Sequence, residues 1–132
     1  MKDDPFGLVA SAKDLLTMAD EHTAGLWPRA SALLGRQALE MSLERLWTRC
    51  ADGVQWTPMR CQLLSLPTFL GDAEVAGRAS HAWWALSRAC HHQPYDLGPT
   101  HDELDGWLTD VWDLANAVER RCGAVGSARG DT

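Results

Sequence analysis

Two histidines and an arginine stand together in the run Arg88-Ala89-Cys90-His91-His92. Histidine titrates near neutral pH and can act as a general acid or base, while arginine can hold a phosphate by two hydrogen bonds. Metal-independent RNA cleavage needs both functions, a group that deprotonates the 2′-hydroxyl and a cation that stabilises the developing charge. The same residue types are also typical of a solvated helix end, where the helix dipole favours cations.

Residues 73–92 are predicted to form one continuous helix with two opposed sides. At ~100° per residue, an apolar stripe and a polar stripe fall almost opposite each other. The apolar stripe comprises Ala79, Trp83, Leu86 and Cys90. The polar stripe comprises His81, Ala85, Arg88 and His92. Because one apolar stripe is enough to anchor a helix to a core, we expect the polar stripe to remain free for binding.

Further candidates for binding lie close to these histidines. Trp84 points to a different side of the helix from Trp83, and either contacts a partner or a base or simply packs. Tyr95 and Asp96 lie in the proline-containing loop that follows the histidines. They either pack between helices or orient an imidazole, since a carboxylate partner raises the pKa of histidine.

The same region does not predict a metal or cofactor site. Cys90 and His92 point to opposite sides of the helix, and His81 lies roughly 16 Å from His92 along its axis. A zinc ion would need ligands from other helices at ~2.0–2.3 Å, and no spaced motif supplies them. Since the sequence also shows no glycine-rich phosphate loop, no cofactor is expected.

Composition restricts the class of protein. A chain of 132 residues is expected to form a single domain, and its net charge of −6 disfavours a general nucleic-acid binder. No apolar run approaches ~18 residues, and the N-terminus lacks the features of a signal peptide, so we expect a cytoplasmic protein with no membrane contact. The four cysteines show no CxxC spacing, which favours reduced thiols.

Start and stop signals place the first two long helices. The first begins with Asp4 as N-cap and Pro5 as first residue, and it ends before Gly25. The second runs from about Pro28 to Cys50, and its leucines recur at helical spacing.

The next two helices are delimited by prolines. A short helix has Thr57 as N-cap and Pro58 as first residue, and we expect Pro67 to stop it. The third long helix opens after the N-cap Asp72. It is expected to close at Gln93, because a residue before proline avoids helical geometry.

The fourth long helix has the strongest start signal. Thr100 and Glu103 form an S/T-x-x-E capping box, and an apolar face follows as far as Val118. We expect the helix to end near Gly123. The chain is therefore predicted to be all-α, an antiparallel up-and-down four-helix bundle with one short extra helix. Residues 1–122 would form this domain, and residues 123–132 a flexible C-terminal tail.

Several motifs resemble the HEPN superfamily of small helical bundles. One is the run Arg36-Gln37-Ala38-Leu39-Glu40 on an early long helix, followed by the Arg/His cluster at the end of a later one. Residues 86–92, 95–97, 99–100 and 103–104 are similar to a run found in short actinobacterial HEPN-like proteins. The resemblance covers the second to the fourth long helix.

The resemblance implies roles for individual residues. HEPN ribonucleases carry an arginine, four to six arbitrary residues and then a histidine, on a helix that meets its copy across a dimer interface. By this likeness Arg88 would hold a phosphate, and His92, with His91 as the alternate, would be the acid or base. Here two residues separate Arg88 from His91 and three separate it from His92. Other HEPN domains are non-catalytic and bind small ligands, nucleotides or a partner protein.

Two functions follow as expectations. In the first, a homodimer joined through the polar stripe binds RNA or a nucleotide phosphate in the resulting cleft, and either does or does not cleave it. His81, Trp84, Tyr95 and Asp96 would support binding, and a cleaving form would be a toxin-like ribonuclease with an antitoxin partner. In the alternative, the chain is a non-catalytic interaction module, a regulatory subunit in defence or signalling that docks another protein.

Overall fold

The computed structural model describes residues 4–17, 27–91 and 98–130, with side chains as far as Gly123. These residues form helices joined by turns, and no strand occurs among them. The elements are α1 (Pro5–Thr17), α2 (Trp27–Cys50), the short 3₁₀ helix η1 (Val54–Trp56), α3 (Met59–Leu70), α4 (Ala73–Cys90) and α5 (His101–Gly130). The predicted all-α class is confirmed.

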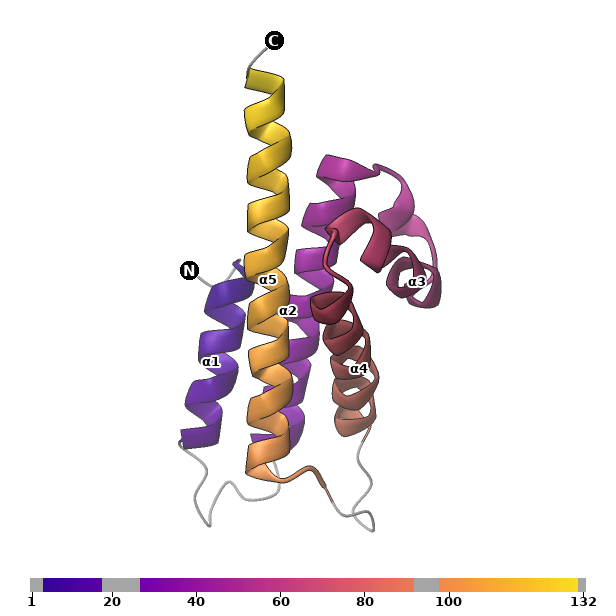
Figure 1. Cartoon of the computed structure of the whole chain (residues 1–132). Coiled ribbons are helices and arrows are strands. Elements are labelled where there is room, and N and C mark those ends of the chain that lie inside the picture. Colours follow the sequence, from indigo (N-terminus) through magenta and orange to yellow (C-terminus); the bar gives the residue numbers. More distant parts are fainter. Residues whose placement is uncertain (1–3, 18–26, 92–97, 131–132) are drawn as a thin grey trace.

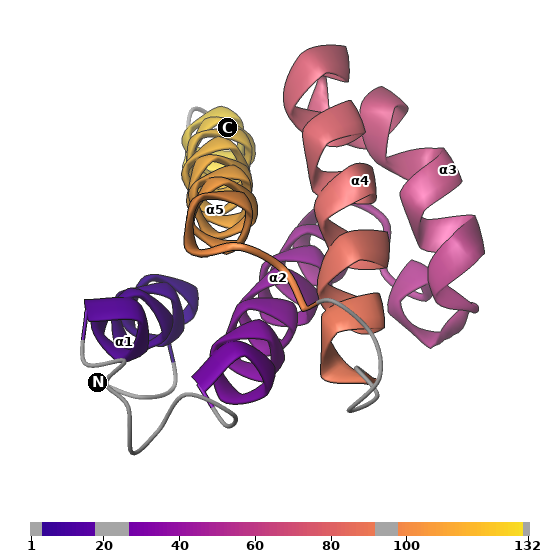
Figure 2. The same cartoon turned by 90° about the horizontal axis from the view of Figure 1, so that it is seen from below.

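Four long helices run side by side in alternating directions, as Figure 1 shows. From the N-terminus, α1 descends, α2 ascends, α4 descends and α5 ascends. The view from below in Figure 2 places α3 outside this group, along the outer side of α4. The structure therefore confirms an antiparallel up-and-down bundle with one short extra helix. None of the described helices has the length and hydropathy needed to cross a membrane.

The core lies between α2, α4 and α5, with α1 closing one side. Its largest fully buried side chains are Trp47, Leu39, Leu43, Leu46, Leu66, Leu86, Leu104, Leu108 and Leu114. Gly35 permits the close approach of α2 to its neighbours. A Cβ atom at Gly35 would lie 2.6 Å from Leu108 Cδ2 and 3.4 Å from Leu86 Cδ1, closer than side chains normally pack.

The predicted starts of α1, α4 and α5 are confirmed by their capping hydrogen bonds. The carboxylates of Asp4 and Asp72 accept backbone N–H groups of the first turns of α1 and α4, at 2.9 and 3.0 Å. At α5 the Thr100 hydroxyl accepts from the Glu103 N–H and the Glu103 carboxylate accepts from the Thr100 N–H, both at 3.1 Å. Each bond satisfies a backbone donor that the helix leaves unpaired.

The start of α3 differs from the prediction. Thr57 is not its N-cap, because its hydroxyl donates to the Val54 carbonyl oxygen at 2.7 Å and so closes the turn of η1. Pro58 takes the cap position, and its carbonyl oxygen accepts the first backbone N–H groups of α3. A threonine before a proline predicts a cap only when no preceding turn uses its hydroxyl.

The end of α3 also differs, because Pro67 does not stop the helix. Pro67 is exposed, whereas Leu66 and Leu70 on either side of it are buried. The proline costs the helix one N–H donor, and burial of the leucines on the opposite side compensates for that loss. The helix stops instead at Gly71, whose positive φ of 74° and N–H bond to the Pro67 carbonyl form a left-handed C-cap.

The last two helices end at other points than expected. α4 ends at Cys90 rather than at Gln93, and the His91 N–H donates to the Arg88 carbonyl at 3.1 Å in a tightened final turn. α5 continues past Gly123 to Gly130. Proline and glycine mark where a helix can stop, and local hydrogen bonds determine where it does.

Candidate functional site

The two-sided character of α4 is confirmed along its described length. Of the predicted apolar stripe, Ala79, Trp83 and Leu86 are buried and Cys90 is half-buried. Of the predicted polar stripe, His81 and Arg88 are exposed and Ala85 is half-buried. The polar stripe is thus left uncovered by the described residues of the chain, as its position opposite the apolar stripe predicts.

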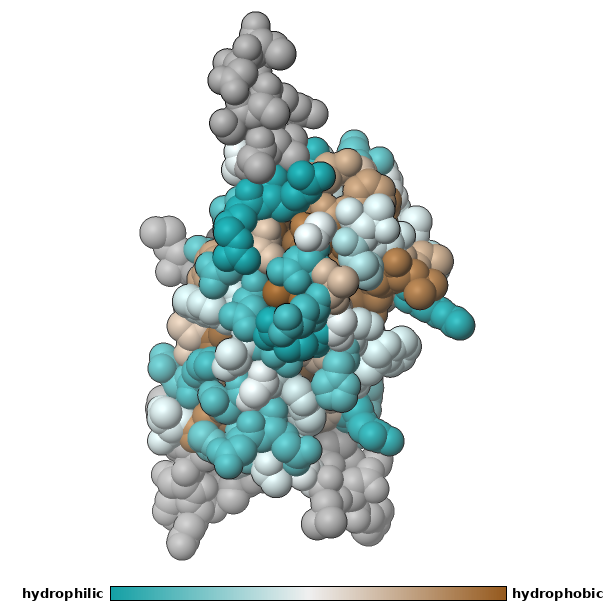
Figure 3. Space-filling view, viewed as in Figure 1, coloured by the Kyte–Doolittle hydropathy of each residue, from teal (hydrophilic) through white to brown (hydrophobic). Residues whose placement is uncertain are grey.

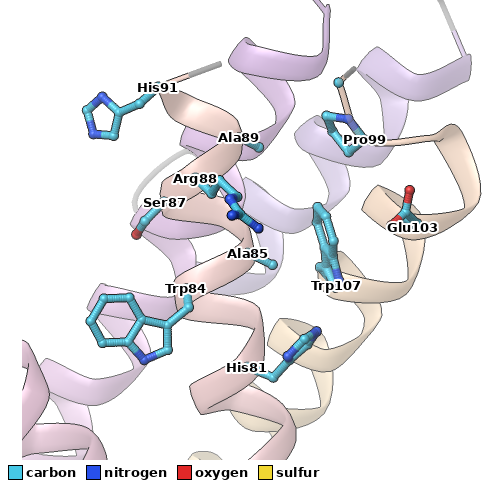
Figure 4. Close-up of a pocket in the computed structure, with 11 residues that line it drawn as sticks. His81, Trp84, Ala85, Ser87, Arg88, Ala89, His91, Pro99, Glu103 and Trp107 are labelled. Atoms are coloured by element: carbon cyan, nitrogen blue, oxygen red, sulfur yellow. The ribbon is translucent and has the colours of Figure 1, made fainter. Parts of the chain in front are cut away.

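A groove of about 960 Å³, open to solvent, runs along this uncovered side and reaches the first turns of α5 (Figure 4). Its walls come from the second half of α4, from the residues before α5 and from the start of α5. They are His81, Trp84, Ala85, Ser87, Arg88, Ala89, His91, Gly98, Pro99, Glu103 and Trp107. Four described residues that the sequence singled out therefore share one surface hollow: His81, Trp84, Arg88 and His91.

These side chains divide between two sides of α4, as Figure 4 shows. The Arg88 guanidinium is directed toward Trp107 of α5, and His81 lies on that same side. The side chains of His91 and Trp84 point to the other side of the helix. Within one subunit the Arg88 guanidinium therefore faces Trp107, and His91 is not brought beside it.

His81 lies on the same side of α4 as Arg88 but about two turns away. The two residues are seven positions apart on one helix, which places them about 10 Å apart along its axis at 1.5 Å per residue. A general base must lie within about 2.6–3.2 Å of the proton that it removes. His81 and Arg88 therefore lie at different levels of the groove, an arrangement suited to contacts with different parts of one elongated ligand.

Arg88 makes no hydrogen bond or ion pair with any other part of the described chain. Glu103 lines the same groove, and its carboxylate accepts the Thr100 N–H in the capping box. The guanidinium thus faces a partly aromatic wall, and its donors bond to none of the described residues. Such an arginine is suited to bind a phosphate or a carboxylate from outside the chain.

Arg78, two to three turns earlier on α4, is bonded within the chain. Its Nη1 lies 2.8 Å from Asp113 Oδ2 and 3.2 Å from Asp110 Oδ1 on α5, and its Nε lies 4.0 Å from Glu74 Oε1. The hydrogen bonds to Asp113 and Asp110 raise the pKa of this guanidinium. Arg78 therefore joins α4 to α5, and its charge is already compensated.

The buried side of α4 carries a separate arrangement against α2. Arg36 Nε donates to Glu40 Oε1 at 3.1 Å, and its guanidinium carbon lies 4.6 Å from the centre of the Trp83 ring. Burial raises the pKa of the Cys90 thiol, an effect that the nearby Arg36 charge opposes. The Arg36–Glu40 pair that the helical spacing predicts is present. It packs α2 against α4 rather than lining the groove.

Sequence reasoning missed some of the groove. The helical spacing after residue 100 predicts Trp107 only as part of the apolar face, and the S/T-x-x-E pattern predicts Glu103 only as half of a capping box. Trp107 is half-buried, whereas Leu104 and Leu108 on that face are fully buried. The position of Trp107 at the edge of the apolar face is the sequence feature that could have indicated its exposure to the groove. Ser87 was not singled out either, and its buried hydroxyl has no hydrogen-bond partner among the described residues.

Three predicted site residues, His92, Tyr95 and Asp96, lie outside the described residues. Within the described ranges, no three His, Cys, Asp or Glu side chains are grouped so that they could hold a metal ion. Among described residues the site is therefore a groove with one uncompensated arginine, two imidazoles and two indoles.

Comparison with known proteins adds no assignment. The chain matches no protein-family model, and neither the curated proteins nor the solved structures include a significant match to it. The likeness to HEPN proteins consequently stays a prediction from the sequence motifs.

Proposed function

We propose that the chain is a HEPN-like binding module that holds a phosphate-bearing ligand, a nucleotide or RNA, in the groove between α4 and α5. Arg88 binds the phosphate, and the indole of Trp107 offers a surface on which a base can stack. His81 and Trp84 extend the contact along and across α4. The homodimer that the resemblance implies is part of the proposal.

The observation that carries the proposal is the Arg88 guanidinium in the groove, which has no carboxylate partner among the described residues. Arg36, Arg45 and Arg78 each pair with a carboxylate. Arg88 points toward Trp107 and lacks such a pair within the described residues. A cation beside an aromatic wall suits ligands that join a phosphate to a planar base, because charge-assisted hydrogen bonds and stacking then act together.

The geometry favours binding over cleavage. His91 points away from Arg88, and His81 is about two turns distant. Cleavage would need an acid or base placed at the same phosphate as the cation. That role falls to His92 in the resemblance, and it stays a prediction to be tested separately.

The test compares Arg88→Gln with Arg120→Gln, a matched loss of an exposed arginine near the far end of α5. Fluorescence polarisation with a labelled single-stranded RNA, and competition by nucleoside mono-, di- and triphosphates, give the affinities. We expect Arg88→Gln to weaken binding about 10- to 100-fold, the value of a charge-assisted hydrogen bond pair. Arg120→Gln should leave it unchanged. Equal losses for both variants, or no binding by the wild type, would reject the proposal.

Cleavage is tested on the same RNA by gel electrophoresis without added metal. The proposal of binding alone expects intact RNA with the wild type. Cleavage that His92→Ala abolishes would instead establish the ribonuclease, and growth arrest relieved by the same substitution would identify a toxin.

A second candidate, the non-catalytic protein-interaction module, is favoured by a different observation. Trp84 is 59% exposed on an otherwise polar helix side. Exposed tryptophans are enriched at protein interfaces, and the net charge of −6 suits a protein partner better than a nucleic acid. Co-purification of one specific protein from its native source, lost in Trp84→Ala and kept in Arg88→Gln, would favour this function.

A further inference from the structure

Two cysteines lie at the end of the bundle opposite the groove. Cys50 is the last residue of α2, whose C-terminal end is at the upper end of the bundle in Figure 1. Cys122 lies on α5, about 28 Å along the helix axis from Glu103 of the groove at 1.5 Å per residue. Both thiols are free. The binding of a phosphate in the groove uses neither of them.

Contacts between α2 and α5 define how these two helices are aligned. The helices run in the same direction, and Gly35 of α2 lies against Leu108 of α5. Closer to the upper end, Arg45 of α2 forms an ion pair with Glu119 of α5. In both contacts the residue of α5 is numbered 73 or 74 higher than the residue of α2. The alignment of the two helices is therefore constant over these turns.

The same alignment places the two thiols at one level. Continued to the end of α2, it brings Cys50 within about 3 Å of the level of Cys122 along the helix axes. Cys122 Sγ lies 3.9 Å from the Arg45 carbonyl oxygen, which is little more than one turn before Cys50. Burial raises the pKa of the Cys122 thiol, and negative charge on the nearby Cys50 raises it further. The two thiols are therefore close enough to act on each other.

Both thiols face the inside of the bundle. Cys50 continues the stripe of the fully buried Leu43 and Leu46 at helical spacing and packs against the core. On α5, Cys122 follows the buried Val118 by about one turn and is 7% exposed. The surface over α5 is largely hydrophilic in Figure 3, as expected where the apolar side chains of that helix point inward. Cys50 is half-buried, so it is the thiol that a reagent reaches first.

We propose that Cys50 and Cys122 form a redox-modification site, at which a small-molecule disulfide converts the two thiols into an internal disulfide. Because Cys50 ends its helix, its backbone is the less restrained of the two and can adjust to disulfide geometry. The other two cysteines are placed differently. Cys61 is exposed on α3, and Cys90 lies beside Arg36 at the far end of α4. The bond would tie the end of α2 to α5, and this inference does not depend on the ligand of the groove.

The reaction proceeds by two thiol–disulfide exchanges. The Cys50 thiolate attacks one sulfur of the small disulfide, forms a mixed disulfide and releases one small thiolate. The Cys122 thiolate then attacks the Cys50 sulfur, forms the internal bond and releases the second small thiolate. The two protein thiols lose two electrons and two protons, and the small disulfide takes them up as it is reduced to two thiols.

The test uses oxidised glutathione and a Cys61→Ser/Cys90→Ser chain, in which only the proposed pair remains. Intact-mass spectrometry should show the loss of two hydrogens per chain, and peptide mapping should recover Cys50 joined to Cys122. We expect the oxidised chain to unfold at a temperature about 10 °C higher than the reduced chain, because a cross-link that closes a long loop restricts the unfolded state. Circular dichroism measures this shift and shows that each variant is folded.

The matched control is a Cys90→Ser/Cys122→Ser chain, which keeps Cys50 and the exposed Cys61. It should gain glutathione and form no internal bond. Three outcomes would overturn the proposal: a glutathione adduct on the test chain that does not resolve to an internal disulfide, a covalent dimer as the only oxidised product, or an internal bond that forms equally well in the control.

Discussion

The contact between α4 and α5 has two halves, and each contains an arginine of α4 in a different environment. In the half near the start of α4, Arg78 is held by Asp110 and Asp113. In the half near its end, Arg88 faces Trp107 across an open groove without a partner in the described chain. The same two helices thus form a closed ion-paired contact and an open hollow. An arginine therefore serves structure or is available to a ligand according to the carboxylates that the facing helix supplies.

Substitution of a core residue that supports both halves should lower the free energy of unfolding the most. Leu86 is fully buried and lies against the Gly35 contact with α2. We expect Leu86→Ala to lower the free energy of unfolding by about 2–5 kcal/mol, through lost burial and the cavity left behind. Urea unfolding followed by tryptophan fluorescence measures the loss. Leu33→Ala, at an exposed leucine, serves as the control, and similar losses for both would show that Leu86 is not a core residue.

Removing the ion pairs of the closed half should cause the next largest loss in the free energy of unfolding. Arg78→Gln removes the ion pairs with Asp110, Asp113 and Glu74 and leaves three carboxylates close together. Because the Arg78 side chain is 39% exposed, solvent screens these pairs, and we expect a loss of about 1.5 kcal/mol from the free energy of unfolding. The loss should shrink in 1 M salt. An Arg78→Gln protein as stable as the wild type would show that the ion pairs of Arg78 do not stabilise the fold.

The capping box at the start of α5 should contribute less. Thr100→Ala removes the hydroxyl that accepts the Glu103 N–H, and we expect a loss of about 1 kcal/mol. Thermal unfolding by circular dichroism measures it. Thr100→Ser keeps the acceptor and should retain wild-type stability, so a Thr100→Ser protein as unstable as Thr100→Ala would argue against the cap.

The open half should be the least sensitive to substitution in the absence of ligand. Arg88→Gln should change the free energy of unfolding by no more than about 0.5 kcal/mol, because no described group depends on that guanidinium. The same urea unfolding measurement applies. A loss as large as that of Arg78→Gln would show that Arg88 has a structural partner, and the contrast between the two halves would fail.

How far the sequence predicts the site can be judged from particular residues. Helical periodicity separated the buried Trp83 from the exposed Trp84 and placed His81 and Arg88 on the open side. It did not predict that Trp107 would face Arg88, since that arrangement depends on how two helices sit against each other. Nor could it predict that His91 points away, because α4 ends just before this residue.

Local chemistry was determined by the sequence itself: the caps at Asp4, Asp72 and Thr100, the apolar stripes and hence the helical bundle. These features depend on residues within one or two helical turns of each other, which the sequence displays directly. Only the tertiary structure decided that α3 continues through Pro67, that Arg78 is compensated and that Arg88 has no partner among the described residues. Those outcomes depend on burial and on side chains that a different helix brings near, and spacing along one helix does not contain that information.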